Sequence, residues 1–416
     1  MASTINEVVL QGINHDGFGE SIASHFLGSP SFSNSVRTHH YWDGSSVNML
    51  AKDAEKNLKV DVKDKRVYVV VSPRSGDSTD VKINDLYHLF KTTAHSAKKA
   101  GAAEIIGIMS YLFYGRSHRE VPGEPVFMEL LPGELRLAGF SKIMTLAAHN
   151  REDTYREFAK AYGVPDGRKV LYSLDPTLIQ ADIFLNQLRR NGLTGRRIVI
   201  GELDKGAVQW TRPYLETLEK LGGIPRSQLS IARFKKERLE PGNPRLTEAS
   251  LDSYVDLDSR ALEGFAETVF VPVDDIADTL SSIYWALLAV HASGRGDPEY
   301  VVANLPHALL YKNAPKIVDS LGINLISSTS LPTRRTKEEI KPLPITWYDP
   351  TNFFMRAIRG CIGNGQTLDE VFERDYHSLG YVKELYNLVL PEPGTQKQGL
   401  LELRKFTPDF SARPLM

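Results

Sequence analysis

Three carboxylates and a hydroxyl follow one apolar run, a pattern suited to holding a sugar or a metal-bound phosphate. The run Thr268–Val273 predicts a buried strand, and Asp274, Asp275, Asp278 and Thr279 come after it. In an open α/β sheet, ligands bind at the carboxyl ends of the strands. A carboxylate can accept two hydrogen bonds from neighbouring ribose hydroxyls. The alternative is a solvated strand end in which Asp278 and Thr279 cap the next helix.

A second candidate segment, Tyr111–Arg119, interleaves aromatic residues with arginines and a histidine after another predicted strand. Aromatic rings can sandwich an adenine, and the guanidinium forks of Arg116 and Arg119 can grip phosphates. The segment therefore predicts a nucleotide site. A surface loop with a partly buried aromatic cluster is an equally good interpretation of the segment by itself.

Two possible metal ligands stand beyond the ends of other predicted strands. His149 follows the run Lys142–Ala147, and Asp204 takes the equivalent position after Arg197–Gly201. One imidazole and one carboxylate could share a Mg²⁺ ion with the phosphates of a nucleotide. An isolated histidine is more often a structural residue, so it is the matching position of Asp204 that favours a metal role for His149.

A basic run, Arg233–Arg238, stands at the end of the short predicted strand Leu229–Ala232. The segment beyond it, Arg238–Asp258, is rich in charges and contains Pro-Gly-Asn-Pro, which predicts a mobile loop or insertion. Mobile basic residues can close over phosphates and stabilise charge in a transition state. The alternative is a basic cluster exposed to solvent.

Short β-branched runs alternate with longer helical patterns, and these elements must position the candidate residues. Such alternation predicts an α/β fold with mostly parallel sheets covered by helices on both faces. The expected strands are Val67–Val71, Glu104–Met109, Lys142–Ala147, Arg197–Gly201, Leu229–Ala232, Thr268–Val273, Tyr300–Ala303 and Asn324–Ser327. The expected helices include Leu86–Ala100, Pro176–Asn191, Val208–Leu221, Ile283–Ala292 and Ala314–Leu321.

The same alternation divides the chain into two Rossmann-like halves. We expect an N-terminal domain over residues 1–168, joined by residues 348–380, and a C-terminal domain over residues 169–347. The boundary is expected within Arg151–Asp175, which is charged and contains Gly-Val-Pro-Asp-Gly. Residues 381–416 are expected to form a C-terminal extension.

Composition argues against several classes of protein. The 416 residues include 50 basic and 51 acidic side chains, so no broad basic face for nucleic acid is expected. Cys361 is the single cysteine, which excludes an internal disulfide and a cysteine-rich zinc site. No run approaches the ~20 apolar residues of a membrane span, and the first residues lack the pattern of a signal peptide. We therefore expect a cytoplasmic protein that binds neither membranes nor nucleic acids.

Taken together and in order, these segments resemble the ribose-phosphate diphosphokinase family, the phosphoribosyl pyrophosphate (PRPP) synthetases. The resemblance runs from about Tyr41 to Phe372. Its motifs are Lys98–Ala102, Tyr111–Arg119, His149, Asp204, the pair Lys236 and Arg238, Asp274–Thr279 and Ser330–Pro332. It implies two phosphoribosyltransferase-type domains and a homo-oligomer, either a dimer or a hexamer.

The resemblance also implies a reaction in which the anomeric hydroxyl of a ribose 5-phosphate attacks ATP, with Mg²⁺ as cofactor and AMP as leaving group. Such chemistry depends on positioning and charge neutralisation. By match, Lys236 and Arg238 would be catalytic, and His149 and Asp204 would hold the metal. ATP would bind Tyr41, Asp43, Arg116, Ser117, His118 and Arg119, and the sugar acceptor would bind Asp274, Asp275, Asp278, Thr279, Ser281 and Ser282.

This chain departs from the family pattern where a terminal 5-phosphate would bind. The family has glycines after the Asp-Thr pair, whereas Leu280 and Ser281 do not readily adopt positive φ. Ala147 replaces an acidic residue near the metal histidine, and Ser117 and His118 replace a Gln-Asp pair. We therefore predict a diphosphokinase whose acceptor is ribose 5-phosphate or a 5-substituted derivative such as ADP-ribose.

Two other functions stay open from the sequence. The lost glycines and altered ATP residues favour a non-catalytic subunit that regulates a true synthetase, whereas the retained Lys236 and Arg238 oppose that role. A base-using phosphoribosyltransferase is the weakest alternative, because such chains are usually single domains that lack the Lys-x-Arg arrangement.

Overall fold

The computed structural model describes residues 7–11, 18–27, 36–43, 45–73, 83–118, 120–238, 247–256, 264–311, 313–329, 337–372 and 382–389. They form two units, each with its own sheet and its own core. The first unit comprises Met1–Asp175, Ser330–Pro332 and Phe353–Leu368. The second comprises Pro176–Thr329, Thr333–Asn352 and Asp369–Met416.

The first unit is built on a five-stranded sheet in the order β1-β4-β5-β6-β7, with every pair of neighbours parallel. The strands are apolar runs that are buried along nearly their whole length, as parallel strands covered on both faces require. They are β1 (Glu7–Gln11), β4 (Arg66–Val71), β5 (Glu104–Met109), β6 (Lys142–Leu146) and β7 (Leu171–Leu174).

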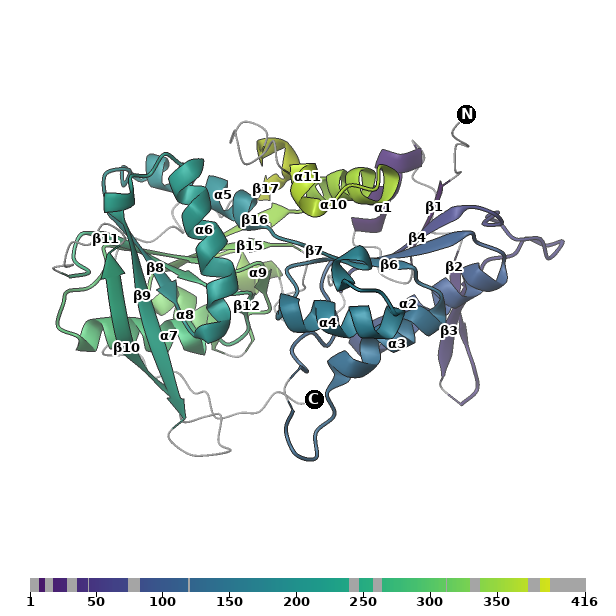
Figure 1. The fold of residues 1–416 in the computed structure, drawn as a ribbon, viewed down its shortest axis with the longest axis horizontal. Coiled ribbons are helices and arrows are strands. Elements are labelled where there is room, and N and C mark those ends of the chain that lie inside the picture. The colour runs from purple at the N-terminus through teal and green to yellow at the C-terminus, as the bar shows by residue number, and fades with distance from the viewer. Residues whose placement is uncertain are drawn as a thin grey trace. The chain divides into compact units, whose positions relative to one another are not determined.

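Helices cover both faces of this first sheet (Figure 1). They are α1 (Phe18–Leu27), α2 (Ile83–Lys99), α3 (Phe127–Ala138), α4 (Arg151–Tyr162) and α10 (Thr351–Ala357), which the π-helix η4 (Ile358–Gly363) continues. Helices α2, α3 and α4 bury apolar side chains in one core with the sheet. On the opposite face, the rings of Phe18 in α1 and Phe354 in α10 meet edge to face, 5.2 Å between centroids.

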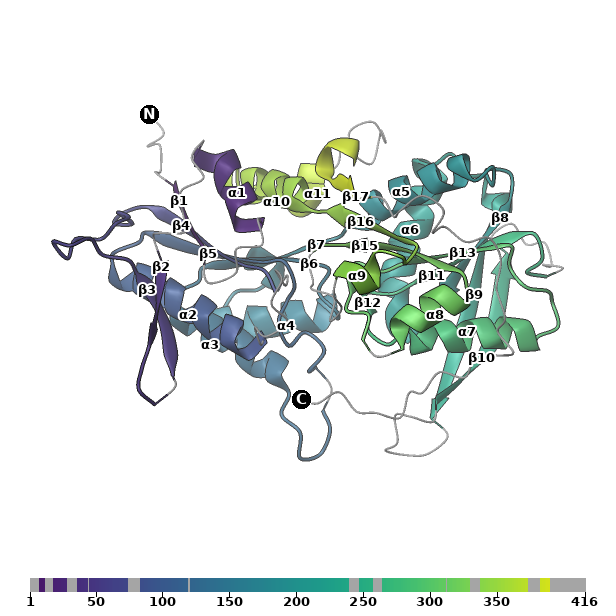
Figure 2. The same ribbon diagram turned by 180° about the vertical axis from the view of Figure 1, so that it is seen from behind.

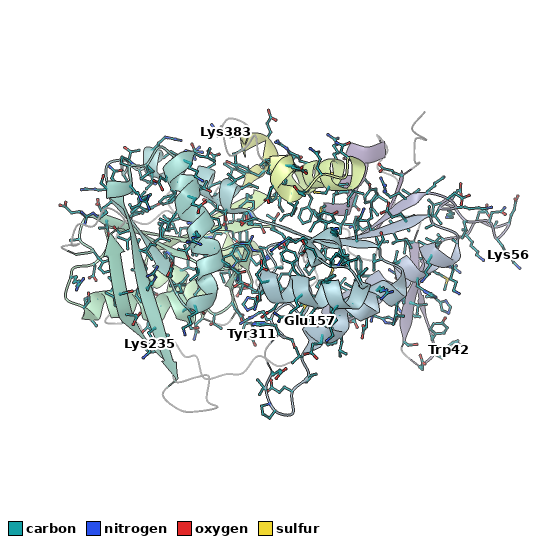
Figure 3. All side chains as sticks on the ribbon, viewed as in Figure 1. Trp42, Lys56, Glu157, Lys235, Tyr311 and Lys383 are labelled. Carbon is teal, nitrogen blue, oxygen red and sulfur yellow. The ribbon has the colours of Figure 1, made fainter. Side chains whose placement is uncertain are left out.

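A β-hairpin made of β2 (Val36–His40) and β3 (Ser46–Leu50) extends from the first unit (Figure 1). Its base is tied to α2 through Asn48. The Asn48 N–H donates to Thr92 Oγ1 and the Asn48 amide donates to Thr93 Oγ1, both at 3.0 Å. The hairpin therefore has an anchored base and a projecting tip, where Figure 3 labels Trp42.

The second unit is built on an eight-stranded sheet in the order β10-β9-β8-β11-β13-β15-β16-β17. The strands from β9 to β16 run parallel, and antiparallel strands flank them on both edges. The strands are β8 (Arg197–Glu202), β9 (Leu229–Arg238), β10 (Thr247–Asp256), β11 (Thr268–Val273), β13 (Tyr300–Asn304), β15 (Ile323–Ser328), β16 (Ile345–Asp349) and β17 (Asn387–Val389).

Helices also cover both faces of the second sheet. Figure 1 shows α6 (Val208–Lys220) in front, beside α5 (Thr177–Arg190), and Figure 2 shows α7 (Ser281–Ala292) and α8 (Ala314–Ser320) from behind. Helices α7 and α8 enclose an apolar core with the sheet. The shorter elements are η1 (Gly167–Lys169), η2 (Lys205–Ala207), η3 (Arg226–Gln228), α9 (Lys337–Ile340), α11 (Leu368–Phe372), η6 (Lys383–Leu385), β12 (Ile276–Ala277) and β14 (His307–Ala308).

The prediction that Arg238–Asp258 is an irregular loop is wrong for the described part of that segment. Strand β9 continues to Arg238, and β10 pairs with it antiparallel over Thr247–Asp256. Most side chains of β10 are charged or carry hydroxyls, so the strand lacks a clear alternation of apolar and polar residues. Leu251 nevertheless packs against the apolar core on the α7 side. Residues 239–246 lie outside the described part of the chain.

The first unit ends at Asp175, beyond residue 168 but within the segment Arg151–Asp175 in which the boundary was expected. Strand β7 pairs with β6, so residues up to Asp175 belong to the first unit. Of residues 348–380, which were expected to join this unit, Phe353–Leu368 do so. Within the described ranges, no helix combines the length and apolar character needed to cross a bilayer.

Gly107 in β5 provides a test of packing in the first core. A Cβ atom there would lie 2.6 Å from Ile143 and 2.7 Å from Phe90. We expect Gly107→Ala to lower the free energy of unfolding by about 1–3 kcal/mol, because overpacking forces a close-packed core apart. Gly195→Ala is the matched control, since a Cβ there meets nothing within 4 Å. Chemical denaturation gives the free energy of unfolding of both variants. Equal values for Gly107→Ala and Gly195→Ala would contradict the packing described around Gly107.

Candidate active site

The acidic loop after β11 is held by backbone hydrogen bonds to the segment after β13. The His307 N–H donates to the Asp275 carbonyl at 3.1 Å, and the short strands β12 and β14 then pair in parallel. The Tyr311 N–H donates to the Asp278 carbonyl at 2.7 Å. Figure 3 labels Tyr311. The segment that the sequence predicts for sugar binding is therefore a turn fixed to a neighbouring segment at the carboxyl end of the sheet.

The carboxylates of this loop differ in exposure. Asp275 is 4% exposed, whereas Asp274 and Asp278 are half-buried. Asp274 Oδ1 accepts the Asp275 N–H at 2.9 Å, which orients the Asp274 carboxylate beside the strand end. The loop thus gathers three carboxylates in one turn, where they can accept hydrogen bonds from hydroxyls or face a cation.

Leu280 adopts the left-handed backbone conformation that glycine takes without strain, with φ 59° and ψ 15°. For an ordinary L-residue this conformation costs about 1–2 kcal/mol. The side chain is 4% exposed and belongs to the core with α7 and α8, so its burial offsets the cost. The sequence predicts that Leu280 does not readily adopt positive φ. The structure shows that it does, because burial of its side chain in the core compensates for the backbone strain.

Thr279 and Ser281 form the entrance to α7. The Thr279 hydroxyl donates to Ser281 Oγ at 3.1 Å, and the side chains of Thr279, Ser281 and Ser282 are half-buried. The first backbone N–H groups of α7 follow at once. Hydroxyls and N–H groups at a helix N-terminus are suited to an anionic group, so this end of the loop is chemically distinct from its carboxylate end.

Asp204 follows β8, and β8 is the neighbour in the sheet of β11, the strand that the acidic loop follows. Strand β8 pairs with β11 in a register that places Glu202 opposite Val273, so Asp204 and Asp274 follow neighbouring strands. Asp204 Oδ1 accepts the N–H groups of Gly206 and Ala207 at 2.9 and 3.2 Å and so caps η2. This cap holds the carboxylate in place at the same end of the sheet.

The basic run lies on strand β9 rather than in a loop. Arg233 pairs with Glu202, with Nε and Oε2 2.7 Å apart. Lys236 and Arg238 stand opposite Ala249 and Thr247 of β10. The side chains of Lys236 and Arg238 lie outside the described residues, so their predicted catalytic role stays a prediction.

The aromatic residues predicted to sandwich adenine serve instead in the first unit's own packing. Phe113 is fully buried, and the ring of Tyr114 lies 4.1 Å from that of Phe127. The Tyr114 hydroxyl donates to Asn84 Oδ1 at 2.6 Å. The aromatic-cluster interpretation is therefore confirmed for these two residues. Arg116 is exposed, and Arg119 lies outside the described residues.

The structure brings His118 and His149 together, which the sequence analysis did not predict. Their ring centroids are 4.9 Å apart, and both side chains are half-buried. His118 follows β5 and His149 follows β6, which are neighbours in the sheet. Ala147, just before His149, has a φ of 46°. The sequence signal that could have suggested the pair is that the two histidines follow consecutive predicted strands, which are often neighbours in a sheet.

The hairpin tip carries Tyr41 and Asp43, two of the residues predicted to bind ATP. Tyr41 is 47% exposed and Trp42 is fully exposed. Asp43 Oδ1 accepts the Ser45 hydroxyl at 2.7 Å and the Ser45 N–H at 2.9 Å, and these bonds lower the pKa of Asp43. Ser45 thus shapes the turn that presents Asp43.

The predicted metal ligands are divided between the units, His149 in the first and Asp204 in the second. No group of three or more histidine, cysteine, aspartate or glutamate side chains in the described ranges is arranged to hold a metal. Mg²⁺ prefers oxygen ligands. The carboxylate of Asp204 fits that preference, and the imidazole pair of the first unit does not.

Leu280 provides a test of the balance between strain and burial. We expect Leu280→Gly to lower the free energy of unfolding by about 2 kcal/mol, because losing a buried leucine costs ~2–5 kcal/mol and relief of strain returns ~1–2 kcal/mol. Glu267→Gly is the matched control, since Glu267 also has positive φ (56°) but its side chain is 82% exposed. Thermal and chemical denaturation measure the stability of both variants. A gain in stability on Leu280→Gly would contradict the contribution of the Leu280 side chain to the core.

Comparison with known proteins bears on the family and the fold. Residues 8–139 match the family model of the N-terminal domain of ribose phosphate pyrophosphokinase. The chain is similar to the crystal structure of phosphoribosylpyrophosphate synthetase from Mycobacterium smegmatis, at a TM-score of 0.63 and 16% identity, over 86% of this chain and 100% of that chain. Orotate phosphoribosyltransferase from Aeropyrum pernix matches 38% of this chain and 72% of its own at 22% identity and a TM-score of 0.23. No curated protein matches.

These findings confirm the fold class expected from the sequence, two α/β units of the phosphoribosyltransferase type with mostly parallel sheets. The family model covers most of the first unit's sheet, and the structural likeness extends the fold over both units. They also confirm the resemblance drawn from the motifs. Over residues 8–139 the chain matches the N-terminal domain of the ribose phosphate pyrophosphokinase family, and its fold is similar to that of a PRPP synthetase.

Proposed function

We propose that this protein is a diphosphokinase that transfers the β,γ-diphosphoryl group of ATP to the anomeric hydroxyl of a ribose-phosphate acceptor and releases AMP. The observation that carries the proposal is the acidic loop of the second unit. It ends a central parallel strand, presents Asp274, Asp275 and Asp278, and leads through a left-handed residue into α7. A ribose would place its hydroxyls against the carboxylates and its 5-substituent toward the start of the helix.

We further propose that the acceptor is ribose 5-phosphate or a derivative with a substituent on that phosphate, such as ADP-ribose. The turn into α7 keeps the left-handed conformation at Leu280 although the glycine is lost. Ser281 adds a side chain where the family has a second glycine, which supports an acceptor whose phosphate is bound less closely. A phosphate diester carries less negative charge than a terminal phosphate group, so it needs fewer hydrogen-bond donors from the protein.

ATP is proposed to bind the exposed Arg116, with Ser117, His118 and Arg119, and the hairpin residues Tyr41 and Asp43 of a neighbouring copy. The projecting hairpin tip supports a homo-oligomer, because a ring on such a tip is presented away from its own unit. A divalent cation, Mg²⁺ by family expectation, would neutralise the phosphates when bound, with Asp204 as a suitable ligand.

The residues of this chain would act by positioning and by charge. Asp275 would orient the ribose hydroxyls, which aligns the anomeric hydroxyl for in-line attack on the β-phosphorus. Lys236 and Arg238 would stabilise negative charge on the transferring phosphoryl oxygens. Lys236 and Arg238 lie on the β-hairpin of β9 and β10 and not in a loop. Their backbone is therefore held in a regular strand that leads toward the proposed acceptor site of the second unit.

The experiment that tests the function measures AMP release from ATP in the presence of Mg²⁺, with ribose 5-phosphate and ADP-ribose offered in parallel. We expect AMP with at least one acceptor and none without an acceptor. Release only with ADP-ribose would support the substituted acceptor, and equal or better turnover of ribose 5-phosphate would contradict it. No release with either acceptor would contradict the proposed reaction and favour a regulatory subunit.

Lys236 can be tested against its neighbour in the same strand. We expect Lys236→Ala to lower turnover at least about 100-fold, the effect of losing one donor to a transition-state anion, with folding intact. Lys235→Ala is the matched control: Lys235 is exposed on the same strand and is not assigned to catalysis (Figure 3). Steady-state AMP release and circular dichroism compare the variants, and a near-normal rate for Lys236→Ala would refute the role.

Asp275 can be tested through acceptor affinity. We expect Asp275→Asn to raise the acceptor KM while the KM for ATP changes little, because the variant keeps the shape but weakens charge-assisted hydrogen bonds from the ribose hydroxyls. Asp319→Asn, in the exposed part of α8, is the control for a change in charge alone. An unchanged acceptor KM in a folded Asp275→Asn variant would argue against the assignment.

A further inference from the structure

The end of strand β13 holds the first two carboxylate residues of the acidic loop by their backbones. The Asp274 N–H donates to the Asn304 carbonyl at 3.3 Å, and the His307 N–H donates to the Asp275 carbonyl at 3.1 Å. Asn304 is the last residue of β13 and lies opposite Val273, the last residue of β11. The position of Asn304 therefore determines where Asp274 and Asp275 leave the sheet.

The side chain of Asn304 is directed toward helix α6. Val301 and Ala303 of the same strand belong to the core with α7 and α8, and successive side chains of a strand alternate between the two faces. Asn304 thus points to the opposite face, which α6 covers (Figures 1 and 2). Tyr214 of α6 is its neighbour there, because burial raises the pKa of the Tyr214 hydroxyl and the adjacent Asn304 amide lowers it.

Both polar side chains are completely enclosed, and their hydrogen-bonding capacity is not met. Asn304 and Tyr214 are each 0% exposed. The two amide atoms of Asn304 and the hydroxyl of Tyr214 form no hydrogen bond of normal geometry with any other described residue. Buried polar atoms in this state lower the stability of a fold. The pair is therefore retained at a cost in stability.

An apolar pair would fill the same space without this cost. Phenylalanine has the ring of tyrosine and leucine has the branched shape of asparagine, so both unsatisfied groups could be removed without leaving a cavity. The Tyr214 ring already packs beside that of Phe184 in α5, with 6.1 Å between the centroids. Stability by itself does not account for the polar pair. Departures from the most stable choice are concentrated at functional sites.

The pair connects the two elements that carry the carboxylates of the proposed site. Helix α6 follows η2, which Asp204 caps, and β13 ends on the residue that accepts the Asp274 N–H. The contact between Tyr214 and Asn304 therefore sets the spacing between Asp204 and the acidic loop. In a reaction that depends on alignment, a displacement of about 1 Å can cost on the order of 100-fold in rate.

We propose that Tyr214 and Asn304 are positioning residues that fix the acidic loop relative to Asp204 and so align the acceptor hydroxyl for attack. Both side chains are enclosed by protein, so they act through the elements that carry them and not by touching a substrate. The inference rests on the proposed function for its effect on the reaction. Its effect on the acidic loop requires no turnover.

The test combines Tyr214→Phe with Asn304→Leu in the full-length protein. We expect kcat for AMP release to fall at least about 10-fold while the acceptor KM changes less than about 3-fold, because the loop keeps its carboxylates and loses only its alignment. The melting temperature should stay the same or rise, since unsatisfied buried groups are removed. An unchanged kcat, or a lower kcat that accompanies a lower melting temperature, would overturn the proposal.

Two single variants provide a second measurement and a control. Tyr214→Phe removes one hydroxyl and leaves the rest of the packing in place, and it should lower kcat at least about 3-fold. Tyr300→Phe makes the same chemical change at the start of β13, where the Tyr300 hydroxyl accepts a hydrogen bond from Asn191 Nδ2 at 3.4 Å. It should leave kcat unchanged. Equal rates for the two variants would contradict a role specific to Tyr214.

Hydrogen exchange separates this inference from the proposed function. Amides of residues 273–279 should exchange at least about 10-fold faster in the double variant than in the unmodified protein, because the loop is held less firmly. Faster exchange in a protein that releases no AMP with any acceptor would support the positioning role and contradict the diphosphokinase. AMP release with exchange and kcat both unchanged in the double variant would support the enzyme and overturn the positioning role.

Discussion

The candidate site of the second unit depends on the backbone pairing between β12 and β14. This short ladder, extended by the hydrogen bond from Tyr311 to Asp278, holds the acidic loop against the segment that follows the next strand. Without it, three carboxylates in one turn would repel one another and spread into solvent. With it, Asp275 is buried at the strand end and α7 begins at a defined position. The start of α7, and with it the proposed place of the acceptor's 5-substituent, follows from this pairing.

Leu280 shows how a loop keeps its path after losing its glycine. Its positive φ is unfavourable by itself, but its side chain adds to the core between α7 and the sheet. The free energy gained by burying the Leu280 side chain exceeds the strain energy of its backbone. The turn into α7 therefore keeps its backbone conformation although its side chains differ. The chemistry offered to an acceptor can therefore change through the half-buried side chain of Ser281, while the backbone route into α7 is retained. This is the physical basis for proposing a changed acceptor instead of a lost one.

The two units contribute different ligand chemistry. The second unit offers oxygen donors through Asp204 and the acidic loop, and the first offers two imidazoles. The proposed phosphoryl transfer depends in addition on the basic residues of β9, which follow the same edge of the second sheet.

The sequence by itself determined the parallel α/β architecture, because apolar runs such as Glu104–Met109 and Thr268–Val273 have the length and composition of buried strands and appear with the same bounds in the structure. It also placed the acidic loop and Asp204 after strands, since both follow directly on apolar runs in the sequence. Only the tertiary structure decided that His118 meets His149, that Tyr114 packs inside its own unit, that β10 is a strand and that Leu280 turns left-handed. Each of these depends on contacts between residues distant in the chain, whose energies outweigh local preferences.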